Sequence, residues 1–269
     1  DIHTEQLNLG FDLQEDPLMR VVCIITGENE CQLLIAMHHI ITDGWSLPIY
    51  LGHLFQHLKD ALDGKEVAVD KTDTGLFEQH VRSLMLRDRD ESLSYWKKLL
   101  EGYETKAEMV SYEKDDSPES GNVNDHLTLS LGQGQTEKLK AVCAANGATL
   151  SHATELAWGI VLQRYTRLDD VVFAKVVSCR DKLVLSSVEG APMDMSGVVG
   201  PFINSIPVRI KTDDNSSLSE VLRTVSNQAA ESNAHDYCSL SEIQQQTELG
   251  SNLFQSILAF ENYPVPDEI

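Results

Sequence analysis

The sequence predicts a mixed α/β fold, in which strands and helices alternate along a chain of 269 residues. Short runs rich in β-forming residues are separated by turn residues, and longer segments carry apolar side chains at helical spacing. The hydrophobic content of 42% is sufficient for a sizeable core. A chain of this length forms one large domain or two modest ones. We find no internal repeat and no low-complexity tract.

A β-hairpin and a helix are the first elements expected. Residues 18–37 contain two β-rich runs around the turn GENE at 27–30. The second run, CQLLIAM, is almost wholly apolar, which is typical of a strand buried on both faces. We expect Ser46 to cap the following helix, Pro48 to lie in its first turn, and Gly64 to end it.

The alternation of helices and strands continues along the rest of the chain. A second helical region is expected at 74–101, and a linker at 113–124, where EKDDSPESGNVN is polar, acidic and broken by Pro and Gly. The later elements expected are strands at 125–131, 169–179, 202–210 and 253–263, and helices near 135–146, at 149–165 and after a capping box of Ser217 and Glu220. We therefore place one domain at 1–112 and a second at 125–269.

Charge and cysteine content argue against several classes of function. Lys and Arg number 21 and Asp and Glu number 42, which gives a net charge of −21 and disfavours nucleic acid or an anionic membrane as a partner. The five scattered cysteines form no CxxC pair, so we predict free thiols in a cytoplasmic protein rather than disulfides or a zinc knuckle. No apolar run approaches the length of a membrane span. The N-terminus has neither Met nor a signal peptide, so we expect a fragment.

The stretch MHHIITDGWSLP, at 37–48, places two adjacent histidines close to an Asp–Gly pair, where a strand is expected to end. Neighbouring side chains on a strand point to opposite faces, so the two histidines cannot serve one site without a bend. No HExxH helix or carboxylate trio accompanies them, and we predict no metal site. One histidine is expected in the core and the other in a cleft, where a neutral imidazole can accept a proton.

Asp43 and Gly44 follow the two histidines. Asp43 is suited either to orient an imidazole ring, as in a catalytic triad, or to pair with a distant cation. Gly44 permits close backbone approach or a positive φ before the helix. From this pattern alone, two structural histidines and a catalytic site are equal alternatives.

HHIITDG resembles the HHxxxDG motif of the condensation domains of nonribosomal peptide synthetases, which are relatives of chloramphenicol acetyltransferase. Further segments resemble that family in the same order: YWKKLLEGYE, YTRLDDVVFAKVVSCR, VVGPFINSIPVRI, HDYCSLSEIQ and LFQSILAFENYP. The resemblance covers nearly the whole chain. It implies two chloramphenicol acetyltransferase-like lobes with the active site at their interface. The first lobe is expected to be incomplete, because the family's first two motifs would precede residue 1.

The resemblance also implies roles for individual residues. His39 would be the catalytic residue, and His38 the inward, structural one. Asp43 would form a salt bridge with Arg180, which ends the later motif, and would not orient His39. The salt bridge between Asp43 and Arg180 would hold the loop that carries His39 in shape, on the side away from the substrates.

Three further residues would lie near the substrates. Gly44 would bring its backbone close to the reacting centre, where an N–H could stabilise an oxyanion. Asn204 would lie close to the active site from the second lobe, beside Ser205, which replaces the usual threonine and keeps the hydroxyl. The alternative for Asn204 is a structural amide at a turn or a sheet edge.

The family reaction joins two substrates that arrive on the phosphopantetheine arms of carrier proteins. An acyl or peptidyl thioester on an upstream carrier would react with an aminoacyl thioester on a downstream carrier, next to an adenylation domain. The domain itself would bind no cofactor and no metal. The sequence leaves open whether His39 takes a proton from the amine or positions it.

Other functions remain as alternatives. An epimerisation domain of the same superfamily shares the double histidine, but usually lacks the pair formed here by Asn204 and Ser205. A non-catalytic fragment that only docks carrier or partner domains would not need the intact His39, Asp43 and Arg180. A cyclisation domain would replace the histidines by aspartates, and a free-standing acyltransferase would leave the FENYP segment unexplained.

Overall fold

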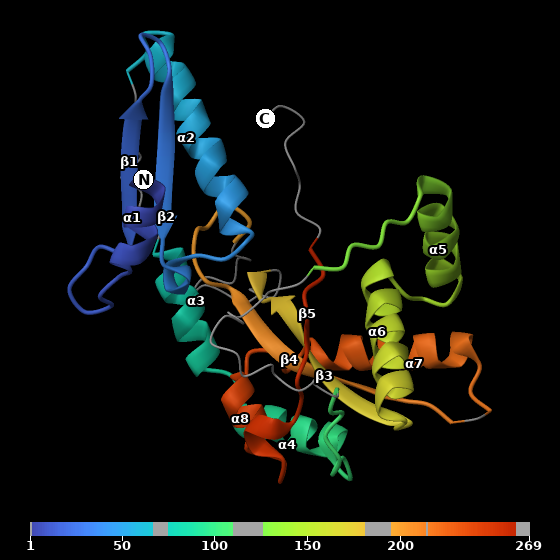
Figure 1. Cartoon of the computed structure of the whole chain (residues 1–269). Helices are drawn as coiled ribbons and strands as arrows, with labels where there is room; N and C mark the ends of the chain where they lie inside the picture. Colours follow the sequence, from blue (N-terminus) through green and yellow to red (C-terminus); the bar gives the residue numbers. More distant parts are fainter. Residues whose placement is uncertain (1, 67–74, 110–125, 181–194, 214, 262–269) are drawn as a thin grey trace, which may run out of the picture. The chain divides into compact units, whose positions relative to one another are not determined.

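The computed structural model describes residues 2–66, 75–109, 126–180, 195–213 and 215–261 (Figure 1). The chain forms two compact units. Unit 1 contains Asp1–Leu86 and Ser178–Ile203, and unit 2 contains Arg87–Val177 and Asn204–Glu261. The expected linker at 113–124 lies outside the described residues, and the division of the chain at that linker stays a prediction.

Unit 1 contains the predicted β-hairpin. β1 (Met19–Ile25) and β2 (Cys31–Met37) are antiparallel, with Val22 opposite Leu34. The prediction that the second strand is buried on both faces is wrong, since Leu33 is 45% exposed. Within the described residues, β1 is the only strand that pairs with β2, so the apolar run lies in a two-stranded sheet and not in the middle of a larger one.

The helices described in unit 1 flank this hairpin in the sequence. α1 (Ile2–Leu9) precedes it and was not predicted. The short 3-10 helix η1 (His39–Ile41) and α2 (Ser46–Leu62) follow it, and α3 (Leu76–Met85) comes later. The end of α2 was predicted correctly, because Gly64 adopts a φ of 71° just beyond it.

Unit 2 is built on a sheet with the strand order β4-β3-β5. β3 (Asp170–Ser178) and β4 (Ile203–Lys211) lie where the sequence predicted strands, and the last residue of β3 and the first of β4 belong to unit 1. β5 (Ile257–Leu258) runs parallel to β3. It is much shorter than the strand predicted at 253–263, of which 262 and 263 lie outside the described residues.

Four helices of unit 2 lie close to predicted segments: α4 (Arg89–Leu100), α5 (Gln133–Ala145), α6 (Leu150–Thr166) and α7 (Leu218–Ser232). The short α8 (Leu240–Gln244) and the 3-10 helix η3 (Gly250–Asn252) were not predicted. Ser217 and Glu220 form the predicted capping box of α7. The strand predicted at 125–131 is wrong over 126–131, which forms none, and Leu127 is fully exposed. Its alternating pattern finds no partner strand in the described part of the chain.

The core of unit 2 lies on both faces of the sheet, because successive residues of β3 point to opposite sides. Val171 and Phe173 are fully buried with Leu156 of α6 and with residues of α7. Val172 belongs to a second cluster, with Trp96 of α4 and residues of α8. Figure 1 shows α6 and α7 near one side of this sheet and α4 and α8 near the other.

Close packing of α6 against β4 requires a glycine at position 159. A Cβ atom there would lie 2.5 Å from Cγ1 and 2.8 Å from Cβ of Ile210. We expect Gly159→Ala to lower the free energy of unfolding by about 1–3 kcal/mol, because the added methyl group overpacks the core. Gly52→Ala is the matched control, since it also lies inside a helix but has no atom within 4 Å of the added Cβ.

The control variant is expected to gain up to about 1 kcal/mol from helix propensity. Urea denaturation of both variants provides the comparison. Equal effects of the two substitutions would contradict the packing explanation.

No helix in the described ranges combines the length and apolar character needed to cross a bilayer. None of the five cysteines forms a disulfide in the described structure, and two of them are exposed and three buried.

Candidate functional site

His38 follows β2 directly and is held by local contacts in unit 1. Its backbone N–H donates to the carbonyl of Leu18 at 2.9 Å, and its Nδ1 accepts the N–H of Ile40 at 3.1 Å. The half-buried ring meets Phe11 edge-on, with ring centroids 6.0 Å apart. His38 therefore caps η1, and its role as the structural member of the pair stays a prediction.

His39 is the first residue of η1 and is exposed. Strand alternation does not separate the two histidines, because β2 ends at Met37 and the backbone turns into η1. Within the described residues, no hydrogen bond engages the imidazole of His39. The ring is therefore accessible, and its catalytic role stays a prediction.

The carboxylate of Asp43 is buried and is surrounded by donors. Oδ1 accepts hydrogen bonds from Arg180 Nη2 at 2.9 Å and from the backbone N–H and the hydroxyl of Ser46, both at 2.8 Å. Oδ2 accepts the backbone N–H of Phe202 at 3.0 Å. The ion pair expected between Asp43 and Arg180 is therefore present, and Asp43 does not act on either histidine in this structure.

Arg180 completes the contacts of this buried carboxylate. Its side chain is 6% exposed, and Nη1 donates to the carbonyls of Val198 at 2.5 Å and Met195 at 3.2 Å. The guanidinium also lies over the ring of Phe202, 4.2 Å from its centroid, in a cation–π arrangement. Arg180 thus ties the segment 195–202 to Asp43.

The pKa of Asp43 reflects two opposing effects. Burial acts to raise it, because a buried carboxylate is harder to ionise. The hydrogen bonds from Arg180, the N–H of Phe202 and Ser46 outweigh burial, and the pKa of Asp43 lies below its ordinary value. Asp43 is therefore ionised at neutral pH and paired with Arg180.

The expectation that Ser46 caps α2 is wrong. Ser46 is the first residue of the helix, Trp45 occupies the cap position without a side-chain capping bond, and Asp43 accepts the N–H of Ser46 instead. The hydroxyl of Ser46 accepts hydrogen bonds from Arg180 Nη2 at 2.9 Å and from the N–H of Gly200 at 3.0 Å. We call Asp43, Ser46, Arg180, Gly200 and Phe202 the Asp43 network.

Sequence reasoning missed three members of the Asp43 network: Ser46, Gly200 and Phe202. Gly200 and Phe202 stand within VVGPFINSIPVRI, where the family resemblance was the available signal, whereas Ser46 follows HHIITDG and was interpreted as a helix cap. Nothing in their residue types or spacing indicates that they meet.

Gly200 leaves no room for a side chain. A Cβ atom there would lie 2.8 and 2.9 Å from two ring atoms of Phe77 and 3.1 Å from the ring of Phe202. We expect Gly200→Ala to lower the free energy of unfolding by about 1–3 kcal/mol, measured by urea denaturation, because the rings must move. Gly197→Ala is the control in the same segment, since nothing lies within 4 Å of its added Cβ. A loss of equal size in both variants would argue against the packing explanation.

Gly44 lies between Asp43 and α2. It is not among the described glycines with positive φ, so the left-handed conformation considered for it does not occur. Its closeness to a reacting centre stays a prediction.

Asn204 and Ser205 belong to β4 in unit 2. Asn204 Nδ2 donates to the carbonyls of Asp236 and Cys238, each at 2.6 Å, and Oδ1 accepts the N–H of Ser205 at 2.8 Å. The amide therefore holds the segment 236–238 against the sheet. Closeness of Asn204 and Ser205 to the active site stays a prediction.

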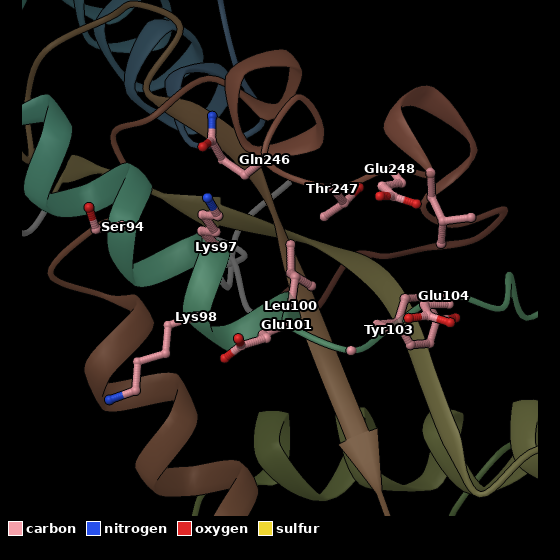
Figure 2. A pocket seen from close by; sticks show the side chains of 12 residues that line it. Ser94, Lys97, Lys98, Leu100, Glu101, Tyr103, Glu104, Gln246, Thr247 and Glu248 are labelled. Carbon is pink, nitrogen blue, oxygen red and sulfur yellow. The ribbon is translucent and has the colours of Figure 1, made fainter.

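A pocket of about 650 Å³ lies in unit 2 between the end of α4 and the segments 101–104 and 246–249 (Figure 2). Leu100 and Tyr103 contribute apolar surface, and exposed side chains of both charges stand around it. None of the predicted site residues lines this pocket. No group of three or more His, Cys, Asp or Glu side chains in the described residues is arranged to hold a metal ion.

Comparison with known sequences adds independent information on this chain. A family model described as a condensation domain matches residues 2–269. Bacitracin synthase 3 of Bacillus licheniformis is 33% identical over 264 residues, which are 98% of this chain and 4% of that protein. The chain therefore spans only a small part of this relative.

Two solved structures illustrate the fold. The first condensation domain of the CDA synthetase has a TM-score of 0.61 at 20% identity, over 90% of this chain and 51% of that one. The epimerization domain from the third module of tyrocidine synthetase B has a TM-score of 0.63 at 20% identity, over 94% of this chain and 55% of that one. The likeness confirms the predicted mixed α/β, chloramphenicol acetyltransferase-like fold, over about half of each solved chain.

Proposed function

Because the chain belongs to the condensation-domain family of nonribosomal peptide synthetases, we propose that the protein that carries it forms an amide bond between two carrier-bound substrates. The donor is an acyl or peptidyl thioester on an upstream carrier protein. The acceptor is an aminoacyl thioester on a downstream carrier protein, loaded by a neighbouring adenylation domain. Both are held on phosphopantetheine arms, and the domain contributes no cofactor of its own.

The observation that carries this proposal is the buried Asp43–Arg180 ion pair behind an exposed histidine. The pair joins residues 137 positions apart in the sequence and anchors the loop that contains His39. A loop braced on its inner side can present an imidazole in one place, which is what reaction between two separately delivered substrates requires.

The proposed reaction proceeds by attack of the acceptor amine on the donor thioester carbonyl. A carbon–nitrogen bond forms, the carbon–sulfur bond breaks, and the donor arm leaves as a thiolate that takes up a proton. The attacking amine loses a proton during this step. His39 either accepts that proton or holds the amine by a hydrogen bond, and alignment of the two reactants supplies a large part of the rate in both cases.

Other residues have supporting roles in this proposal. The backbone N–H of Gly44 stabilises the oxyanion that develops on the carbonyl oxygen. Asn204 and Ser205 shape the substrate surroundings, and the bonds from Asn204 to the carbonyls of Asp236 and Cys238 are consistent with positioning rather than direct chemistry.

The test is a reconstitution with the natural full-length protein. Donor and acceptor carrier proteins are loaded with radiolabelled or mass-labelled thioesters, and amide product on the downstream carrier is followed by mass spectrometry. We expect product only when both carriers are loaded. Absence of amide with every loaded pair of carriers that the protein accepts would contradict the proposal.

Epimerisation is the second candidate, because a solved epimerization domain shares the fold with a TM-score of 0.63. The same reconstitution separates the two functions. An epimerase would exchange the α-hydrogen of a carrier-bound aminoacyl or peptidyl group with deuterated solvent and would form no new amide. The pair Asn204–Ser205 favours condensation.

A further inference from the structure

Ser46 lies at the centre of the Asp43 network and is fully buried. Its hydroxyl oxygen lies 2.8 Å from Asp43 Oδ1 and 2.9 Å from Arg180 Nη2. It also lies 3.0 Å from both the backbone nitrogen and the carbonyl oxygen of Gly200. One hydroxyl therefore contacts the loop after His39, the arginine and the segment around Gly200.

The bonding capacity of a hydroxyl group fixes how these contacts are shared. A serine hydroxyl has one proton and two lone pairs. Arg180 Nη2 and the N–H of Gly200 can only donate, so they occupy the two lone pairs. The single proton goes to Asp43 Oδ1, because this contact is shorter than the one to the Gly200 carbonyl and its acceptor is charged. The hydroxyl is fully used and has one orientation.

Ser46 and the ion pair do different things in this network. Without the Ser46 hydroxyl, Arg180 Nη2 would still donate to Asp43 Oδ1 at 2.9 Å and to the Gly200 carbonyl at 3.3 Å. The N–H of Gly200 would lose its acceptor in a buried place, which is unfavourable. The ion pair thus holds Asp43, whereas Ser46 holds Gly200 against the loop that carries His39.

We propose that Ser46 is a positioning residue for His39, which keeps the loop 38–45 in register with the segment 200–202. This inference rests on the proposed function of His39 and goes beyond it. It holds that the Ser46 hydroxyl, and not the Asp43–Arg180 ion pair alone, fixes the position of the loop relative to the segment 200–202. Loss of the hydroxyl leaves the charges paired but lets the loop and the segment move relative to each other. A displacement of about 1 Å at a reacting group can reduce the rate by about 100-fold.

The experiment compares Ser46→Ala with Ser83→Ala in the natural full-length protein. Ser83 is the matched control, because it is also a buried serine of unit 1, and its hydroxyl donates only to the carbonyl of His80 within its own helix. Amide formation is measured at varied concentrations of loaded carriers, and hydrogen–deuterium exchange is measured for peptides that cover 38–46 and 195–202.

We expect Ser46→Ala to lower kcat by about 10- to 100-fold with KM for both carriers within about twofold. Exchange should become faster in both peptides, including the amide of Gly200, while Ser83→Ala leaves kcat and both peptides within about twofold of wild type. Ser46→Thr, which restores a hydroxyl, should recover most of the rate and the protection. If Ser46→Ala does not fold, Ser46→Thr is compared with Ser46→Cys, whose thiol hydrogen-bonds only weakly. The loss of rate and protection is then expected in Ser46→Cys and not in Ser46→Thr.

Three results would overturn the inference: kcat for Ser46→Ala equal to that of Ser83→Ala, exchange unchanged at 195–202, or Ser46→Thr as impaired as Ser46→Ala. Failure of the proposed function itself has a different signature. In that case the wild-type protein forms no amide, while the exchange data still decide whether Ser46 holds the two segments in register.

Discussion

Asp43→Ala is expected to lower the free energy of unfolding by about 3–5 kcal/mol. The substitution leaves the guanidinium of Arg180, whose side chain is 6% exposed, without its counter-charge. It also removes the acceptor of the Phe202 N–H and of two donors of Ser46. Urea denaturation of the natural protein, with hydrogen exchange at 195–202 to locate the effect, provides the measurement.

Glu78→Ala is the matched control for this prediction. Glu78 also pairs with an arginine, Arg82, at 2.6 Å in unit 1, but both side chains are more than 60% exposed. Its loss should cost less than about 1 kcal/mol. The double variant Asp43→Ala/Arg180→Ala should lower the free energy of unfolding by less than the sum of the two single effects, because no buried charge is left unpaired. A loss below about 1 kcal/mol in Asp43→Ala would contradict the buried ion pair.

The same carboxylate makes stability depend on pH. The pKa of Asp43 is lowered in the folded state. Its contribution is therefore complete at neutral pH, and it is lost as the pH falls from the ordinary aspartate value of about 4 through the lower value of the folded protein. The difference in stability between wild type and Asp43→Asn should shrink over that acid range. A difference that grows on acidification would have the wrong sign for an ionised Asp43.

His39→Ala is expected to reduce amide formation by about 100- to 10,000-fold, the range for loss of a positioned acid–base group. His39 is exposed, and no hydrogen bond to its ring occurs within the described part of the chain, so the effect on stability should be small. Kinetics with loaded carrier proteins measure the rate, and urea denaturation measures the stability. A loss in kcat with little change in KM would place the defect at the reacting groups.

His53→Ala is the control, since His53 is another exposed histidine of unit 1 and lies outside the motif. It should leave the rate within about twofold. The pH dependence of kcat separates the two roles proposed for His39. A general base gives an acidic limb that disappears in His39→Ala, whereas a positioning group leaves the shape of the profile unchanged. Wild-type rates in His39→Ala would contradict its assignment as the catalytic residue.

The sequence by itself was sufficient for elements whose signals are local. The hairpin, the long helices of both units and the capping box of Ser217 and Glu220 follow from spacing and residue type within a few turns of chain. The pairing of Asp43 with Arg180 was also expected, but only through resemblance to a family, because no local pattern links residues 137 positions apart.

Only the tertiary structure decided which elements find partners. The segment 126–131 has an alternating pattern but forms no strand, and β5 has only two residues where a long strand was predicted. A strand forms only where a neighbouring strand accepts and donates hydrogen bonds, and the sequence of one segment does not determine whether such a neighbour is present.

In the candidate site too, the sequence predicted some features and the tertiary structure decided others. HHIITDG marks the loop, and a capping role is the natural expectation for a serine that opens a helix. The fold instead brings Gly200, 154 positions away, within hydrogen-bonding distance of Ser46. A buried N–H and a buried guanidinium both need an acceptor, and this need outweighs the small gain from a helix cap. The role of Ser46 is therefore decided by the groups that are buried around it.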